Sequence, residues 1–194
     1  MRSLLSTLLL AALAVTARAT TVVPPEFSAL VNESDYIIRA VTKSVTAEER
    51  GTKIYTHVQF DVVEVIAGTA PATVTLDFLG GRVGTRVMKV DGMPQFKIGD
   101  EDILFVSGNG RSICPLYGMM HGRYPVQTDA ATGKKYVARF DGSPLQDVSQ
   151  ISATLPATAA LPATLARSGL TPAAFVSEIQ TRVRPDARFN RAQN

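Results

Sequence analysis

Cysteine is almost absent from this chain, since Cys114 is the single one among 194 residues. One cysteine excludes an intramolecular disulfide, so the fold has to rest on its apolar core. No apolar run beyond the first 15 residues is long enough to span a bilayer, which excludes a transmembrane helix from the rest of the chain. The formal net charge is only +3 and the basic residues are scattered, a pattern that disfavours nucleic-acid binding.

The first nineteen residues have the pattern of an export signal. Arg2 gives a positive start, an apolar core runs from Leu4 to Val15, and Ala17-Arg18-Ala19 supplies the small-x-small pattern of a signal peptidase site. We expect residues 1–19 to be a signal peptide, and the exported protein to begin at Thr20 and to work in a periplasm or outside the cell. Loss of the two leader arginines would leave eighteen basic against seventeen acidic residues.

Alternating apolar and polar residues predict a mainly β domain over residues 20–140, which includes a short leading helix at 24–31. Strands are predicted at 36–45, 54–66, 73–78, 83–90, 103–106, 123–128 and 135–140. Residues 103–106 form a continuous apolar run, which is typical of a central strand buried on both faces.

The segment 54–66 changes phase partway along. Val58, Phe60 and Val62 are its apolar positions at first, and Val63 and Val65 then take over. A long strand that changes face needs a bulge near Val62–Val63, and small barrels use such a bend to close. We therefore predict a small, closed or partly open five-stranded OB-like barrel with an extra hairpin, a short N-terminal helix and a C-terminal helix.

Composition changes after the barrel region. Residues 141–170 are rich in Ala, Thr, Ser, Leu and Pro, which indicates a linker or a packed irregular segment. Thr171 and Pro172 then have the character of an N-cap and a first helical residue, so we predict an amphipathic helix at 171–187.

Four stretches carry a likeness to a known group of proteins: Ser34–Ile38 behind the leading helix, Tyr55–Val62, Val65–Gly68 and Gly99–Phe105. Over about residues 26–108 the chain resembles exported, largely uncharacterised bacterial proteins whose barrel is similar to the OB-type fold of the tissue inhibitors of metalloproteinases. Those inhibitors bind the protease zinc through an N-terminal cysteine. This chain has Thr20 at the expected start, so the resemblance implies a fold and not that mechanism.

Two kinds of chemistry could use the segment from Cys114 to His121. The two side chains could form a thiolate–imidazole pair of a cysteine-dependent hydrolase, although no orienting group or oxyanion hole is recognisable. Cys114, Met119 and His121 could instead hold Cu(I), with Met120 on the opposite face of an extended segment. The ordinary explanation for all of them is packing, since a free cysteine behaves as a small buried hydrophobe.

Other polar groups are better explained without a ligand. His57 and Asp61 lie roughly 13 Å apart along a strand, too far for one zinc, so they and Gln59 indicate a solvated face. The acidic residues 100–102 indicate a solvated turn before the buried strand. The glycines of residues 80–84 lack the lysine and the helix of a phosphate loop and indicate a hairpin turn. We expect no cofactor and no metal.

An apolar and aromatic surface is predicted around the loops of the barrel, beside Pro94. Its members are Met93, Phe96, Tyr117, Met119, His121 and Tyr124. The alternative is that these residues belong to the core. With the surface interpretation, the sequence predicts an exported, non-enzymatic module that binds a protein, a peptide or an envelope component. Membrane insertion and nucleic-acid binding are not expected.

Overall fold

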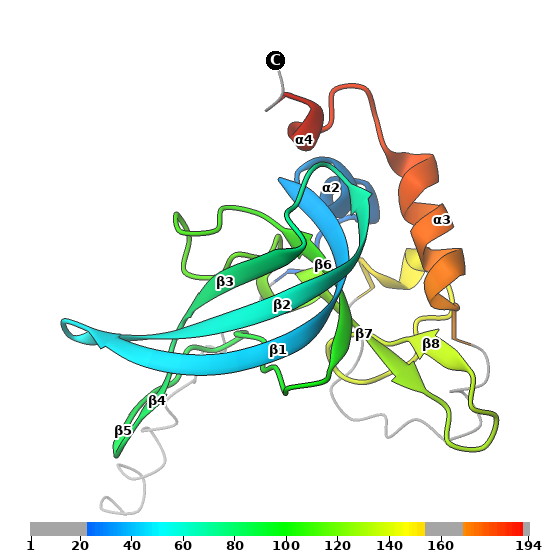
Figure 1. Cartoon of the computed structure of the whole chain (residues 1–194). Helices are drawn as coiled ribbons and strands as arrows, with labels where there is room; N and C mark the ends of the chain where they lie inside the picture. The colour runs from blue at the N-terminus through cyan, green and yellow to red at the C-terminus, as the bar shows by residue number, and fades with distance from the viewer. Residues whose placement is uncertain (1–22, 154–168, 192–194) are drawn as a thin grey trace, which may run out of the picture.

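Strands are the main regular structure in the computed structural model, which describes residues 23–153 and 169–191 (Figure 1). The strands are β1 (Tyr36–Arg50), β2 (Lys53–Ala67), β3 (Thr73–Leu79), β4 (Gly81–Val83), β5 (Arg86–Met88), β6 (Glu101–Val106), β7 (Arg123–Thr128) and β8 (Lys135–Val137). Six of them form one antiparallel sheet in the order β3-β2-β1-β6-β7-β8, and β4 and β5 form a separate hairpin. The predicted mainly β fold is confirmed.

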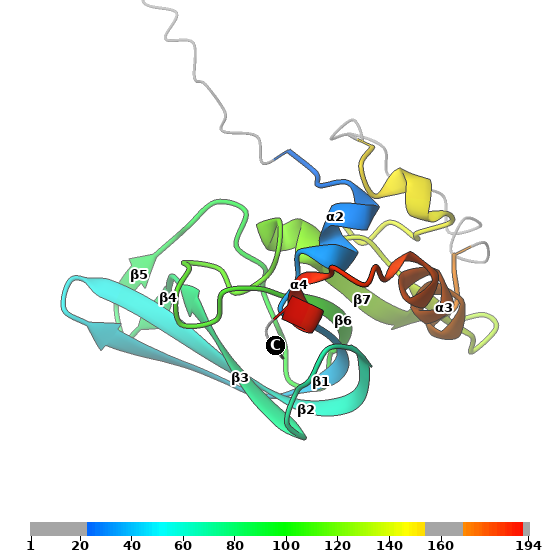
Figure 2. The same ribbon diagram turned by 90° about the horizontal axis from the view of Figure 1, so that it is seen from above.

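Helical elements are short, and they lie at the end of the sheet away from the β4–β5 hairpin (Figure 2). They are α2 (Phe27–Asn32), α3 (Pro172–Arg182), α4 (Arg188–Arg191) and the 3-10 turns η1 (Met119–Gly122) and η2 (Val148–Gln150). The leading helix is present as α2. Helix α3 begins as predicted, because the Thr171 side chain accepts a hydrogen bond from the Ala174 amide at 3.2 Å. It ends at Arg182 and not at 187, since Pro185 disfavours the helical conformation of the residue before it.

Two predicted segments fall wholly or partly outside the described residues. These are the expected signal peptide, residues 1–19, and residues 154–168 of the segment between the sheet and α3. The preceding part of that segment, residues 141–153, packs on the sheet and contributes Leu145, Val148 and Ile151 to the core.

The central strand β6 has apolar side chains on both faces, as its continuous apolar sequence predicted. Ile103 and Phe105 pack in a cluster with α2 and α3, whereas Leu104 and Val106 pack in a second cluster with β2 and β3. All four side chains have 0% of their surface exposed. Successive side chains of a strand point to opposite faces, so β6 separates two apolar cores.

The sheet is open, so the predicted closure into a barrel is not confirmed. Its edge strands β3 and β8 form backbone hydrogen bonds with loops and not with each other. The Leu79 amide donates to the Ile113 carbonyl at 2.8 Å, and the Val137 amide donates to the Leu170 carbonyl at 2.8 Å. The side-chain amide of Asn109 also donates to the Thr75 carbonyl of β3 at 2.8 Å. Edge groups that are already bonded in this way do not recruit another strand.

The long β1–β2 hairpin contains the predicted bulge. Arg39 pairs with Glu64 and Ala40 pairs with Val62, so Val63 of β2 has no partner on β1. The predicted change of face is wrong, however, because Val63 is 55% exposed and Val65 is 41% exposed. A second irregularity lies between Ile37 and Ile38 of β1, which pair with Ala67 and Val65, so Ile66 is also without a partner on β1.

The predicted single strand at 83–90 is also wrong. The chain reverses between Val83 and Arg86, which pair with each other and form the short β4–β5 hairpin. Gly84 has a φ of +56°, a conformation that suits glycine in tight hairpin turns. Residues 89–96, called the pocket loop below, then leave the hairpin without forming a strand and pass across the second apolar cluster.

Candidate functional site

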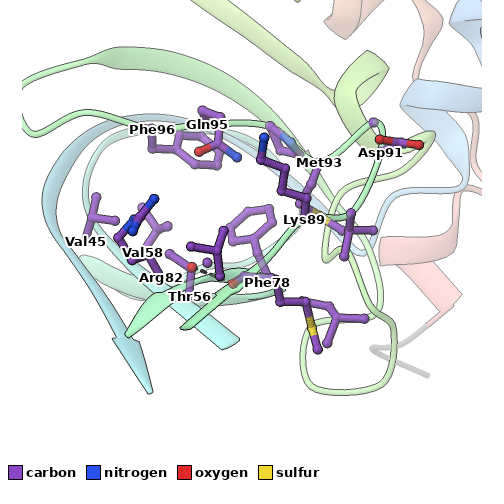
Figure 3. A pocket seen from close by; sticks show the side chains of 18 residues that line it. Val45, Thr56, Val58, Phe78, Arg82, Lys89, Asp91, Met93, Gln95 and Phe96 are labelled. Carbon is purple, nitrogen blue, oxygen red and sulfur yellow. Dashed lines mark hydrogen bonds between the residues drawn. The ribbon is translucent and has the colours of Figure 1, made fainter. Parts of the chain in front are cut away.

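A pocket of about 480 Å³ lies between the sheet, the β4–β5 hairpin and the pocket loop (Figure 3). Strands β2 and β3 supply Val58 and Phe78 to it, and β1 supplies Val45. The pocket loop supplies Met93 and Phe96 from the opposite side. Cavities of several hundred cubic ångströms with mainly apolar walls are typical small-ligand sites.

Two glycines place the hairpin beside the pocket. Gly81 has a φ of +137°, and a Cβ atom there would lie 2.4 Å from the Thr56 hydroxyl oxygen. The same hydroxyl donates a hydrogen bond to the Gly80 carbonyl at 2.7 Å. Only a residue without a side chain allows the chain to leave β3 this close to β2.

Aromatic contacts hold Phe96 against the sheet. Its ring centroid lies 5.2 Å from that of Phe60 and 5.1 Å from that of Phe78. Edge-to-face and tilted pairs at such distances stabilise beyond the burial of their area. The wall that the pocket loop contributes is therefore fixed to β2 and β3 before any ligand binds.

A buried ion pair anchors the pocket loop from its other side. Arg123 of β7 donates to both carboxylate oxygens of Asp102, from Nε at 2.7 Å and from Nη2 at 3.2 Å. Arg123 also donates to the Gln95 carbonyl, and its guanidinium carbon lies 4.4 Å from the Phe96 ring centroid. One side chain thus connects the central strand β6 to two residues of the pocket loop.

Burial raises the pKa of the Asp102 carboxyl, and the nearby Arg123 charge partly offsets this effect. The Asp102 side chain has 0% of its surface exposed. Its guanidinium partner also contacts Asp100 at 3.1 Å. A buried charge of this kind is stable only with a bonded partner, so Asp102 and Arg123 depend on each other.

The interpretation of residues 100–102 as a solvated turn is therefore wrong. Besides Asp102, Glu101 is bonded to two basic side chains, Arg39 at 2.6 Å and Lys135 at 2.5 Å. These two contacts are why the pKa of Glu101 is lowered even though burial acts in the opposite direction. Partners from three other strands, β1, β7 and β8, explain why the acidic run lies within a sheet and not in solvent.

Of the six residues predicted to form an exposed surface, the structure places Met93 and Phe96 together in the pocket. Tyr117 and Met119 are half-buried, and each packs against a different apolar cluster. Tyr124 is only 4% exposed and packs between aromatic rings of the first cluster, which leaves it outside any exposed surface.

His121 is 6% exposed, with its ring centroid 4.8 Å from that of Phe140 in an edge-on contact. Cys114 is buried in the second apolar cluster, and burial raises the pKa of its thiol to about 11. The thiol is therefore protonated at neutral pH, whereas a nucleophile or a metal ligand needs the thiolate. No cluster of three or more His, Cys, Asp or Glu side chains in the described part of the chain is arranged to hold a metal ion.

On the face predicted to be solvated at His57, Gln59 and Asp61, two of these side chains contact charged residues of neighbouring strands. His57 lies 2.6 Å from Asp77 and 3.3 Å from Glu48, and its side chain is 18% exposed. Asp61 pairs with Lys43 at 3.1 Å, with both side chains about half exposed. These contacts connect β1, β2 and β3 across the outside of the sheet, and they account for the charged residues there without a ligand.

Sequence reasoning missed the pocket residues Val45, Val58, Phe78, Arg82 and Lys89. The available signal was the break of the alternating pattern at Gly80–Gly81, which marks where the chain leaves the sheet and creates a wall beside it.

Comparison with known proteins adds no relative: no family model, curated protein or solved structure matches this chain. In the parts of the chain that the structure describes, no helix has the length and apolar character needed to cross a bilayer.

Proposed function

We propose that this protein is an exported, non-enzymatic binding module that takes an apolar group of a protein, a peptide or an envelope component into the pocket under the pocket loop. The pocket itself carries the proposal: its apolar walls come from the sheet, the hairpin and the pocket loop, and its loop wall is held in place by Arg123 and by aromatic contacts. A preformed site of this kind binds without the cost of ordering a loop.

Exposed apolar side chains at the pocket support a binding role. Val87 of the hairpin is 45% exposed and Val45 of β1 is 37% exposed, and both line the pocket. A ligand in the pocket would cover these apolar side chains and remove their surface from water, which favours binding.

The architecture supports a relation to the OB-like exported proteins that the chain resembles. The bulged β1–β2 hairpin and the antiparallel order β3-β2-β1-β6-β7-β8 suit a small barrel that is left open between its edge strands β3 and β8. The pocket is adjacent to β3, at the side where such a barrel is open.

The neutral dye N-phenyl-1-naphthylamine, whose fluorescence increases in apolar sites, tests the proposal. We expect saturable binding to the purified protein. Val87→Glu places a carboxylate at the pocket wall, and we expect it to weaken binding by about tenfold, since a charge is costly to desolvate against an apolar ligand.

Val65→Glu is the matched control, because Val65 is 41% exposed and does not line the pocket. Circular dichroism and thermal unfolding establish that both variants fold. Absence of saturable binding, or an equal effect of the two substitutions, would contradict the proposal.

A further inference from the structure

Two basic side chains at the pocket have no acidic partner among the residues that the structure describes. Arg82 of β4 and Lys89 of the pocket loop both line the pocket, and neither forms an ion pair with a residue that the structure describes. Arg86 of the same hairpin, by contrast, pairs with Glu49 at 2.5 Å. On this hairpin, the basic residue away from the pocket, Arg86, is thus paired with a carboxylate, whereas Arg82 at the pocket can pair with a ligand.

The charges are arranged around the apolar interior. In Figure 3, Arg82 and Lys89 lie on either side of the Phe78 ring, and the Asp91 carboxylate lies beyond Met93 and points away from the cavity. Asp91 is the one acidic residue among those that line this pocket. The opening is therefore positively charged, and it favours a ligand with a negative group near the surface.

The interior offers little to a peptide backbone. Its uncharged polar side chains are Thr56, which donates its proton to the Gly80 carbonyl at 2.7 Å, and Gln95, whose amide lies beside Phe96 on the loop wall (Figure 3). The rings of Phe78 and Phe96 and the Val58 side chain present no hydrogen-bonding group. A buried peptide segment needs partners for its N–H and C=O groups, whereas an acyl chain needs none.

We propose that the pocket binds a single-chain anionic amphiphile, in which an acyl chain contacts Val58, Phe78 and Phe96 and a carboxylate or phosphate head lies near Arg82 and Lys89. This inference rests on the proposed function, since it names the class of ligand for the same pocket. Envelope lipids and their hydrolysis products have this chemistry.

Titration calorimetry with three ten-carbon probes below their micelle concentrations tests the inference: decanoate, decan-1-ol and decyltrimethylammonium. We expect decanoate to bind about tenfold tighter than decanol, because two exposed ion pairs contribute a binding free energy of that order. The cationic probe should bind weakest. The preference for decanoate should fall as salt is added.

The variant Arg82→Gln/Lys89→Gln should remove the preference for decanoate and leave the affinity for decanol unchanged. Its matched control is Lys97→Gln/Lys134→Gln, which removes the same charge from two exposed lysines that do not line the pocket. We expect the control variant to keep the preference.

The outcomes separate the two proposals. If none of the probes binds, the pocket is not an apolar binding site and both proposals are wrong. If decanol and decanoate bind equally, or if both double variants act alike, the anionic ligand is wrong and the pocket remains a binding site. A trileucine peptide with a free carboxylate that binds tighter than decanoate would identify a peptide as the occupant and contradict the acyl assignment.

Discussion

Replacing Arg123 with methionine removes the cation that connects strand β6 to the pocket loop. Asp102 would lose its bidentate partner inside the protein, and Gln95 and Phe96 would lose a contact each. Methionine keeps much of the apolar stem, so the substitution tests the charge more than the volume. Thermodynamic stability and ligand binding should both decrease.

The size of the effect follows from the buried carboxyl. Without Arg123, Asp102 either keeps an unpaired charge or takes up a proton when the chain folds. The ordinary pKa of this carboxyl is 3.8, roughly three units below pH 7. Protonating it at pH 7 costs about 1.4 kcal/mol for each unit, or about 4 kcal/mol in total. Breaking a buried ion pair typically costs 3–5 kcal/mol, so the two values agree.

The loss should depend on pH. In the variant, burial raises the pKa of Asp102 above its unfolded value, and the neighbouring charges of Asp100 and Glu101 act in the same direction. The folded state then holds a proton that the unfolded state releases as pH rises above its own pKa, so stability falls with rising pH. At pH 5 the same protonation costs only about 2 kcal/mol.

Urea unfolding of wild type and Arg123→Met at pH 5 and pH 7 measures this difference. We expect a loss of about 4 kcal/mol at pH 7 and about half of that at pH 5, each relative to wild type at the same pH. Arg123→Met/Asp102→Asn lacks the titrating group, so the extra loss at pH 7 should disappear. A loss that is equal at both pH values, or smaller than about 1 kcal/mol, would refute the role assigned to the buried pair.

Two other predictions concern the pocket wall and the core. Gly81→Ala should lower the free energy of unfolding in urea by about 2–3 kcal/mol, because its Cβ would meet the Thr56 hydroxyl. The control Gly51→Ala, with open space around it, should cost about 1 kcal/mol. Equal losses for the two variants would contradict the close approach at Gly81. The Cys114 thiol, with its pKa raised to about 11 by burial, should not react with iodoacetamide at pH 7 until urea unfolds the protein, and fast labelling of the folded chain would show that the thiol is accessible.

Local patterns predicted several elements correctly. The continuous apolar run of residues 103–106 identified β6, the phase change at Val62–Val63 identified the bulge, and Thr171–Pro172 identified the start of α3. Each of these features depends on neighbours within a few positions in the sequence, because strand alternation and helix capping are properties of the local backbone.

The predictions that were wrong depended on information that a local sequence pattern does not contain. The strand predicted at 83–90 was wrong because a short alternating pattern does not reveal that Gly84 permits a reversal. The acidic run at 100–102 was assigned to solvent because its partners Arg39, Arg123 and Lys135 are distant in sequence. Tyr124 was placed on a surface because an aromatic residue has the same pattern in a core and in a binding site.

The sequence by itself determined the β-rich character of this protein and the two apolar faces of β6, because periodicity shows which side of each strand is apolar. The single cysteine determined that the fold does not depend on an intramolecular disulfide. Only the tertiary structure decided that the sheet stays open and that Val45, Val58, Phe78 and Phe96 enclose a pocket, with Arg123 holding the loop above it. Which distant segments pack across from each other depends on the shapes and bonding groups of both partners, and a pattern along one strand contains only one of them.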